Sequence, residues 1–277
     1  MVWVLGELVV HRPGPALLPF VTSMTGYRQA YLPTGAHRGL PSPALTLVIV
    51  LRGPLVLSGA VGLSGSEIHH DALVGGLQMR PVLVGQHGVS EGLQLAVTPL
   101  GTRALLGVPA SALAMRTVNL AELLGRSAEA LVDKLRATEG WPARFAALEL
   151  ELLRLARPQA SLVPEVAEAW RLITGTAGRL RVERLARGVG WSTRHLGERF
   201  RAETGLTPKQ VARVARLDRA RRLLTAQITN GSALDLGGLA TVSGYCDQAH
   251  LSREWRALCG VPPAAWVSNE LRFVQDR

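Results

Sequence analysis

The spacing of hydrophobic residues changes near Leu100. Before that residue they form short runs rich in β-branched residues, and Gly and Pro separate these runs at close intervals. Such a pattern is typical of an antiparallel sheet with many turns. We therefore expect residues 1–99 to form a small antiparallel β-barrel. The runs are Ala44–Leu51, Leu55–Leu57, Pro81–Val84 and Gly92–Val97.

Beyond Leu100 the hydrophobic residues follow a helical period. Residues 127–138 form one amphipathic segment, and Pro142 begins a second that extends to Leu155. An apolar stripe on the second segment fits either the core of the domain or the seam of a homodimer formed through residues 142–156. Core is the simpler interpretation, because four positions are too few to establish a coiled coil. The stripe consists of Phe145, Leu148, Leu152 and Leu155.

Residues 44–63 are apolar enough to resemble a membrane span, but the Arg-Gly-Pro sequence at residues 52–54 divides them. A β-hairpin that turns at residues 52–54 is the better interpretation, and we expect no membrane partner. The first residues lack the basic segment and the cleavage site of a signal peptide. The only two cysteines, Cys246 and Cys259, belong to no metal-binding or disulfide motif, which favours a cytoplasmic location.

One pattern of residues occurs twice in the C-terminal third. In both copies Ala precedes Gly by four residues, Leu precedes an aromatic residue by four, the aromatic residue precedes a second Gly by five, and this Gly precedes Pro by three. So many matched spacings indicate a duplicated structural unit. The first copy consists of Leu185, Ala186, Gly190, Trp191, Leu196, Phe200, Gly205 and Pro208. The second copy consists of Leu239, Ala240, Gly244, Tyr245, Leu251, Trp255, Gly260 and Pro263.

Each copy has the sequence features of a helix-turn-helix unit. Leu-Ala ends a short helix, and the Gly after it allows a tight turn. Ser192 and Asp247 are suitable N-caps for the helix that follows in each copy. Leu and the aromatic residue four positions later place one apolar stripe on that helix, which leaves its opposite face polar. The second Gly and the Pro then end the helix.

A further helix is predicted between the two copies, over Pro208–Leu224. Thr207 is its N-cap, and Pro208 is its first helical residue. Its length of about 25 Å, at roughly 1.5 Å for each residue, would hold two recognition helices near the ~34 Å repeat of successive major grooves. The same geometry would suit a purely helical scaffold, but the duplicated turn and the basic charge favour DNA.

The chain carries a formal net charge of +10, and most of it lies in the C-terminal part. Residues 161–277 hold 18 Lys and Arg against 11 Asp and Glu, whereas residues 1–160 hold 13 against 10. Lys134 and Lys209 are the only lysines, and the other cations are arginines, whose planar fork suits phosphate and guanine. A genome of high GC content is the alternative explanation for so much arginine.

The C-terminal sequence resembles the AraC/XylS family of bacterial transcription regulators over residues 164–268. The matching segments are RLARGVGWSTRHLGERFRAETGLTPKQ, RLDRARRLL and SGYCDQAHLSREWRALCGVPPAAW. The resemblance implies an α+β protein whose partners are double-stranded DNA, RNA polymerase and an unidentified small-molecule effector. The expected domains are an effector-sensing and dimerisation domain at 1–156 (a cupin-like β-barrel at 1–99, then helices at 100–156), a linker at 157–163, and an all-α double helix-turn-helix domain at 164–277.

The second helix of each helix-turn-helix unit provides the candidate DNA contacts. The family's base-reading positions fall on Arg194, Gly197 and Glu198 in the first copy, where Gly197 replaces the larger side chain usual in the family. Arg194 suits guanine, and Glu198 suits the amino group of cytosine. A solvated helix face is the alternative for each residue. The corresponding residues of the second copy are Gln248, Ala249, His250, Ser252 and Arg253, and the expected phosphate contacts are Thr193, Arg199 and Arg201.

The N-terminal half contains a candidate effector pocket. Aromatic walls with one cation are common in sites for small molecules, and core packing is the alternative. The candidate lining residues are Trp3, Tyr27, Arg28 and Tyr31.

No catalytic motif is found in the sequence. It contains no G-x-S-x-G, P-loop or dinucleotide fingerprint. Cupin-type barrels bind metal through His-x-His, whereas His69 and His70 are adjacent and would point to opposite faces of a strand. We therefore expect no metal, no cofactor and no enzymatic activity. Two alternatives are an enzyme or metal-binding barrel that the helical domain tethers to DNA, and a structural chromosome-coating protein without sequence preference.

Overall fold

The computed structural model describes residues 6–58, 70–157 and 159–270. Trp3 and His69, two of the residues considered above, lie outside these ranges. By their contacts the residues divide into two compact units. The first unit contains residues 1–36, 44–77 and 83–162, and the second contains residues 37–43, 78–82 and 163–277.

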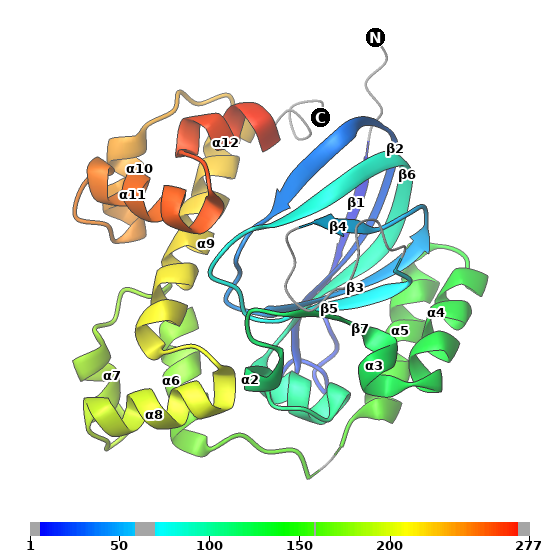
Figure 1. The fold of residues 1–277 in the computed structure, drawn as a ribbon, viewed down its shortest axis with the longest axis horizontal. Coiled ribbons are helices and arrows are strands. Elements are labelled where there is room, and N and C mark those ends of the chain that lie inside the picture. The colour runs from blue at the N-terminus through cyan, green and yellow to red at the C-terminus, as the bar shows by residue number, and fades with distance from the viewer. Residues whose placement is uncertain (1–5, 59–69, 158, 271–277) are drawn as a thin grey trace. The chain divides into compact units, whose positions relative to one another are not determined.

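The first unit is built on an antiparallel sheet (Figure 1). Its strand order is β1-β2-β6-β3-β5-β7, with β4 paired to β6. Because β1 and β7 end this path, the described strands form an open sheet, and the closed barrel expected from the sequence is not confirmed. The strands are β1 (Glu7–His11), β2 (Val21–Gly39), β3 (Leu45–Arg52), β4 (Val56–Ser58), β5 (Ala72–Gly75), β6 (Val82–Val97) and β7 (Thr117–Asn119).

Residues 52–54 separate β3 from β4, which run in the same direction along one edge of β6. The prediction of a hairpin at these residues is therefore wrong. At the end of β3, Arg52 lies opposite Glu91 of β6. Strand β4 then pairs with the same neighbour, β6, with Val56 opposite Gly85. The chain therefore continues in the same direction instead of reversing. Gly53 has φ +86°, and a Cβ atom there would lie 1.9 Å from the Val89 carbonyl oxygen. The residue has to be Gly because a bulge brings the two backbones together.

The two predicted runs at 81–84 and 92–97 belong to the single long strand β6. The stretch between them is rich in Gly and polar residues, which made a turn the natural expectation. In the structure this stretch is extended, because its ends pair with β4 and with the last residue of β3. Pairing with neighbouring strands therefore overrides the local turn preference.

The helices of the first unit follow β6 in sequence, with β7 between α2 and α3. Helix α4 packs against both β3 and α5 (Figure 1). Phe145, Leu148 and Leu152 are all buried inside this unit. These three residues of the apolar stripe on the second predicted helix are therefore core, and the fourth, Leu155, is half-buried. The helices are α1 (Pro99–Gly101), the π-helical turn η1 (Thr102–Leu106), α2 (Ala110–Leu113), α3 (Leu120–Leu124), α4 (Arg126–Ala137) and α5 (Trp141–Leu155).

The long C-terminal part of the second unit is helical. Its linker helix α9 has 22 residues and extends five residues beyond the predicted end, which makes it about 33 Å long at roughly 1.5 Å for each residue. It continues because no helix breaker occurs before Asn230-Gly231, and Ile228 packs against the core of this unit. The helices are α6 (Pro164–Gly175), α7 (Val182–Gly188), α8 (Thr193–Thr204), α9 (Pro208–Thr229), α10 (Leu236–Ser243), α11 (Gln248–Cys259) and α12 (Pro263–Glu270).

The repeated apolar residues form the core of the second unit, as the duplicated pattern predicts. Each of them is at most 1% exposed. The Phe200 ring also stacks on Trp170 of α6, with 6.0 Å between the ring centroids. None of the helices in the described ranges is long and apolar enough to cross a membrane. The repeated core residues are Leu185, Ala186, Leu196, Phe200, Leu239, Ala240, Leu251 and Trp255.

Candidate nucleic-acid interface

Helices α7–α8 and α10–α11 form two helix-turn-helix units with the predicted caps. The Ser192 Oγ atom accepts a hydrogen bond from the His195 backbone N–H at 3.2 Å. Asp247 does the same for the His250 N–H at 2.6 Å. The four glycines of the repeated pattern have positive φ angles between 76° and 84°. Local sequence therefore fixes where each recognition helix begins and ends.

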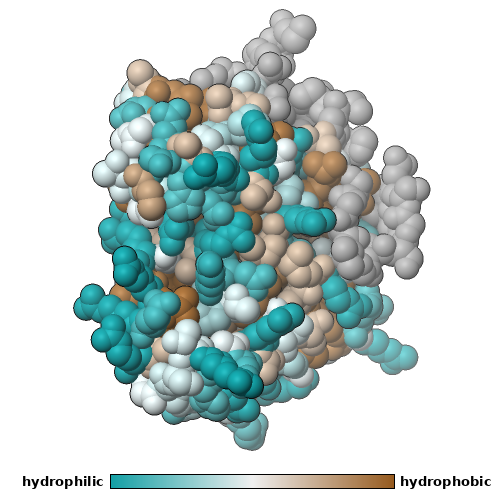
Figure 2. Space-filling view, turned by 60° about the vertical axis from the view of Figure 1, so that its left-hand side comes forward, coloured by the Kyte–Doolittle hydropathy of each residue, from teal (hydrophilic) through white to brown (hydrophobic). Residues whose placement is uncertain are grey.

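The predicted DNA contacts lie on the two recognition helices, α8 and α11. Among those of α8, only Gly197 is partly buried, and a Cβ atom there would meet no atom within 4 Å. On α11, His250 and Ser252 are partly buried. Figure 2, which brings the helix-turn-helix side of the molecule forward, shows mostly hydrophilic residues over it. The exposed candidates are Thr193, Arg194, Glu198, Arg199, Arg201, Gln248, Ala249 and Arg253.

Three of the predicted DNA contacts already have partners within the protein. The Arg194 Nε atom donates to Glu198 Oε1 at 2.9 Å, and the two side chains are 89% and 60% exposed. Such an exposed pair is weak, so DNA bases can replace it at little cost. By contrast, the His250 Nδ1 atom accepts from the Cys246 backbone N–H, and its ring meets the edge of Tyr245. His250 thus supports the turn, which leaves less of the side chain for a base.

Three arginines of α9, spaced by three residues, join this helix to other parts of the second unit. Arg213 donates from Nε and Nη2 to the Glu254 carboxylate of α11, at 2.7 and 3.0 Å. Arg219 donates to the Val242 carbonyl oxygen of α10 at 3.1 Å. These bonds fix the second helix-turn-helix unit against the linker helix.

Arg216, the middle arginine, contacts the segment before α7 and the turn of the second helix-turn-helix unit. Its Nη2 atom donates to the Gly178 carbonyl oxygen before α7 at 2.9 Å. Its guanidinium also lies 5.5 Å from the centre of the Tyr245 ring, in the turn between α10 and α11. Burial raises the pKa of the Tyr245 hydroxyl, so this side chain stays neutral. The period of three along the linker helix could have revealed these arginines in the sequence, but their partners could not.

Four arginines just before and on α7 form a group that was not predicted from the sequence. They line a hollow of about 430 Å³ together with Leu180 and Glu183. Other arginines of the second unit form ion pairs, such as Arg171 with Glu168 and Arg221 with Asp218. The four arginines are Arg179, Arg181, Arg184 and Arg187.

Of the predicted effector residues, the structure describes the side chains of Tyr27 and Arg28, and these two do not line one pocket. Tyr27 and Arg28 are neighbours on β2 and point to opposite faces of the sheet. Burial raises the pKa of Tyr27, whose hydroxyl forms a hydrogen bond with Ser90. Trp3 lies outside the described residues, as does the side chain of Tyr31. Alternation along the strand therefore separates the Tyr27 ring from the Arg28 cation.

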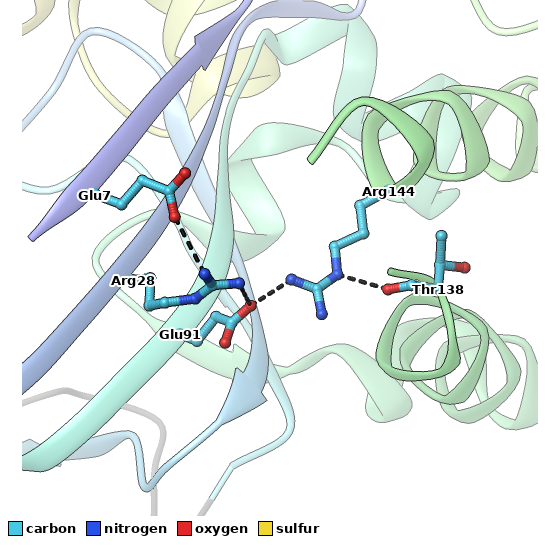
Figure 3. A network of polar contacts seen from close by, with 5 residues as sticks. All are labelled: Glu7, Arg28, Glu91, Thr138 and Arg144. Carbon is cyan, nitrogen blue, oxygen red and sulfur yellow. Dashed lines mark hydrogen bonds and ion pairs between the residues drawn. The ribbon is translucent and has the colours of Figure 1, made fainter. Parts of the chain in front are cut away.

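Arg28 belongs to a polar network between the sheet and α5 (Figure 3). It contacts Glu91 of β6 at 3.1 Å and Glu7 of β1 at 3.3 Å. Glu91 also pairs with Arg144 of α5, whose Nε atom donates to the Thr138 carbonyl oxygen at 2.8 Å. Burial opposes the ionisation of Glu91, but the hydrogen bonds from the two arginines outweigh it and lower its pKa.

The ring of Trp141 completes this network. The Arg28 and Arg144 guanidinium carbons lie 5.6 and 5.2 Å from its ring centre, within the range of a cation–π interaction. Gly26 on β2 leaves room for the ring, because a Cβ atom there would lie 2.5 Å from the ring atom Cε3. Within the described ranges, no group of three or more His, Cys, Asp or Glu residues could hold a metal ion.

Comparison with known families matches residues 185–269 to a helix-turn-helix domain model. The C-terminal unit carries an AraC-type helix-turn-helix domain. The resemblance to the AraC/XylS family seen in the sequence is thereby confirmed for this part of the chain. An AraC-type domain binds DNA, which makes the protein a DNA-binding transcription regulator. No curated protein sequence matches the chain.

Solved structures extend the likeness from the AraC-type domain to most of the chain. ToxT from Vibrio cholerae O395 matches with a TM-score of 0.50 and 12% identity over 88% of this chain and 96% of that chain. The same protein bound to (E)-4-(8-methylnaphthalen-1-yl)but-3-enoic acid gives 0.51 and 11% over 88% and 97%. Wild-type ToxT with a bound unsaturated fatty acid, from Vibrio cholerae strain SCE256, gives 0.51 and 9% over 96% and 97%. These matches confirm the mixed α+β fold, with a sheet region followed by a helical part.

Proposed function

We propose that the protein is a one-component transcription regulator that reads a specific DNA sequence. Residues 164–277 form the DNA-binding domain, residues 1–156 sense an effector and dimerise, and residues 157–163 link them. The observation that carries this proposal is the pair of helix-turn-helix units joined by α9, each with an exposed recognition helix. An effector would act by binding one arrangement of the two domains better than another.

The recognition helices would read bases from both units. Arg194 and Arg253 suit guanine, Gln248 suits adenine, and Glu198 suits cytosine. Ala249 offers a methyl contact to thymine, whereas Gly197 can bring the backbone close to the groove. His250 and Ser252 complete the proposed base contacts, and Thr193, Arg199 and Arg201 bind phosphates.

Selection of binding sites from a pool of random duplexes tests the proposal. We expect two short motifs whose centres lie about 10 base pairs apart, because successive major grooves repeat at that distance. A pool without enriched sequences, bound as tightly as any selected duplex, would contradict sequence-specific regulation. It would favour the structural chromosome-coating protein instead.

The proposed effector is an organic carboxylate, with Arg28 as its cation. This suggestion is supported by the two acids present in the ToxT structures. Arg28 is 50% exposed, and its contact with the exposed Glu7 is of a kind that contributes little. A ligand carboxylate could therefore take the place of Glu7 while Glu91 continues to hold the guanidinium.

Titration calorimetry with an unsaturated long-chain fatty acid tests the effector. The wild-type protein should bind the acid, Arg28→Met should lose binding, and Glu7→Gln should bind more tightly because the competing carboxylate is gone. Binding of the acid should also change the affinity for the selected duplex. Equal affinity in the wild-type protein and Arg28→Met would exclude Arg28 as the cation.

A homodimer through residues 142–156 would have to use the outer face of α5. The exposed residues Ala143, Ala146, Leu150 and Leu153 recur there at spacings of three, four and three. Leu150 and Leu153 are 46% and 42% exposed, and their spacing of three places them side by side on this face. Sedimentation should show that the wild-type protein is a dimer. A double variant with Leu150→Glu and Leu153→Glu should be a monomer. Ala130→Glu, on the exposed face of α4, is the control.

The remaining assignments follow from the regulatory role. RNA polymerase would be the protein partner at promoters, and the cytoplasm would be the location. We propose no enzymatic activity and no cofactor. Stoichiometric metal in the purified protein, or turnover in an activity screen, would instead support a barrel enzyme or metal-binding protein tethered to DNA.

A further inference from the structure

Four arginines surround a hollow beside the first helix-turn-helix unit. Arg179 and Arg181 precede α7, and Arg184 and Arg187 lie on it. The hollow measures about 430 Å³, and its other lining residues are Leu180 and Glu183. Glu183 thus provides the single negative charge in a lining with four positive charges. We call this hollow the arginine pocket.

The four guanidinium groups have no ion-pair partner among the described residues. Arg179 donates from Nε to the Thr176 carbonyl oxygen at 3.1 Å, and Arg187 donates from Nε to the Glu183 carbonyl oxygen at 3.5 Å. Arg181 and Arg184 are exposed and form no side-chain hydrogen bond within the described part of the chain. Most of their N–H donors therefore remain available to an external acceptor.

The Arg179 side chain is also held in place from the second helix-turn-helix unit. A Cβ atom at Gly244, in the turn between α10 and α11, would lie 2.8 Å from Arg179 Cγ. Gly at this position thus lets the aliphatic part of Arg179 pack against the turn. The side chain is supported by packing as well as by a hydrogen bond, so less conformational entropy is lost when its end group binds.

Like charges gathered in one place repel each other, and an anion relieves that repulsion. The guanidinium group binds phosphate oxygens through two parallel N–H donors, which gives strong and directional contacts. In a helix-turn-helix unit the first helix crosses the DNA backbone while the second enters the major groove. Here α7 is the first helix and contacts α8 directly.

We propose that the arginine pocket binds phosphates of the DNA backbone next to the groove that α8 enters. This inference rests on the proposed function in DNA binding and adds a binding site outside both recognition helices. Contacts to phosphate carry no sequence information, so the arginine pocket supplies affinity and register and leaves base choice to the recognition helices.

The test compares a double variant, which carries both Arg181→Gln and Arg184→Gln, with the wild-type protein. Dissociation constants are measured at several salt concentrations, on the duplex selected from the random pool and on an unrelated duplex. Each lost phosphate contact lowers the slope of log affinity against log salt by about 0.9, so we expect a decrease of roughly 1.8 for two contacts. Affinity should fall by the same factor on both duplexes.

Two matched variants serve as controls. A double variant with Arg181→Lys and Arg184→Lys keeps both charges. Its slope of log affinity against log salt should therefore lie close to the wild-type value. Arg171→Gln removes one charge that is already paired with Glu168, and its slope should match that of the wild-type protein. Thermal unfolding of every variant should agree with the wild-type curve, since the altered side chains are exposed.

Two results would overturn the inference while the proposed function stands. One is an unchanged slope in the double Gln variant of a protein that still selects a sequence. The other is a loss of affinity confined to the selected duplex, which would indicate base reading. If the wild-type protein binds no duplex at any salt concentration, the proposed function and this inference fall together.

Discussion

The two helix-turn-helix copies have equivalent buried residues but differ in surface charge. Phe200 and Trp255 occupy the same position in the repeat, and both are fully buried. Residues 179–207, around the first copy, hold seven arginines and three glutamates, whereas residues 235–262 hold two arginines and three acidic residues. The net charges are therefore +4 and −1. A few buried positions suffice to specify the motif, and the exposed positions are left to differ.

The two copies also differ in how they are held. The second copy is bound to α9 by the Arg213–Glu254 pair and by Arg219. The pocket arginines of the first copy form no ion pair with a carboxylate among the described residues. Charge attracts DNA without regard to sequence, whereas a fixed orientation is needed for reading bases. We therefore expect the first copy to supply most of the electrostatic affinity and the second copy to depend on its orientation.

The largest expected effect tests the shared core. Phe200→Ala and Trp255→Ala should each lower the free energy of unfolding by about 3–5 kcal/mol, because a large buried ring leaves a cavity. Urea denaturation followed by circular dichroism measures this loss. Val242→Ala, at a side chain that is 50% exposed, is the control. If one copy tolerated the loss of its ring, the two cores would not be equivalent.

The next effect concerns how the second copy is held. Arg213→Ala should lower the free energy of unfolding by about 1–3 kcal/mol, because it removes two charge-assisted hydrogen bonds and leaves Glu254 without its partner. A double-mutant cycle with Glu254→Ala measures the coupling between the two residues. Additive losses would show that the pair does not fix α11 to α9.

Base reading should differ between the copies. Arg194→Ala should cost about 1–3 kcal/mol of binding on the selected duplex and relax the preference at one base pair. Gln248→Ala should relax the preference in the other half of the site. Fluorescence anisotropy on duplexes with single base-pair changes separates the two effects. Equal weakening of Arg194→Ala on unrelated DNA would make Arg194 a phosphate contact.

The smallest effect is expected at the exposed pair of α8. Glu198→Gln should change the free energy of unfolding by less than about 0.5 kcal/mol, because exposed ion pairs contribute little. The same change should alter the preference at one base pair if Glu198 reads cytosine. Thermal unfolding and a repeated site selection measure the two outcomes. A large loss of stability would mean that Glu198 holds the helix together.

Much of the helical part could be predicted from the sequence. Its helices are specified by caps such as Ser192 and Asp247, by the spacing of apolar residues and by the glycines after each helix. All of these act between residues close in sequence, so the sequence alone is enough to predict them. The end of α9 was placed too early, because Ile228, four residues after Leu224, continues the packed face of the helix. The sheet was predicted as a class of structure, but its strand boundaries and closure were not.

The pattern of the chain by itself determined that a helix-turn-helix motif occurs twice, with a helix between the copies. Only the tertiary structure decided that β4 continues the line of β3, that the α5 stripe is core, and which arginines lack carboxylate partners. The physical reason is the range of the interactions. Caps and helical periodicity join residues close in sequence, whereas Glu254 meets Arg213 and Glu91 meets Arg144 only after the chain has folded.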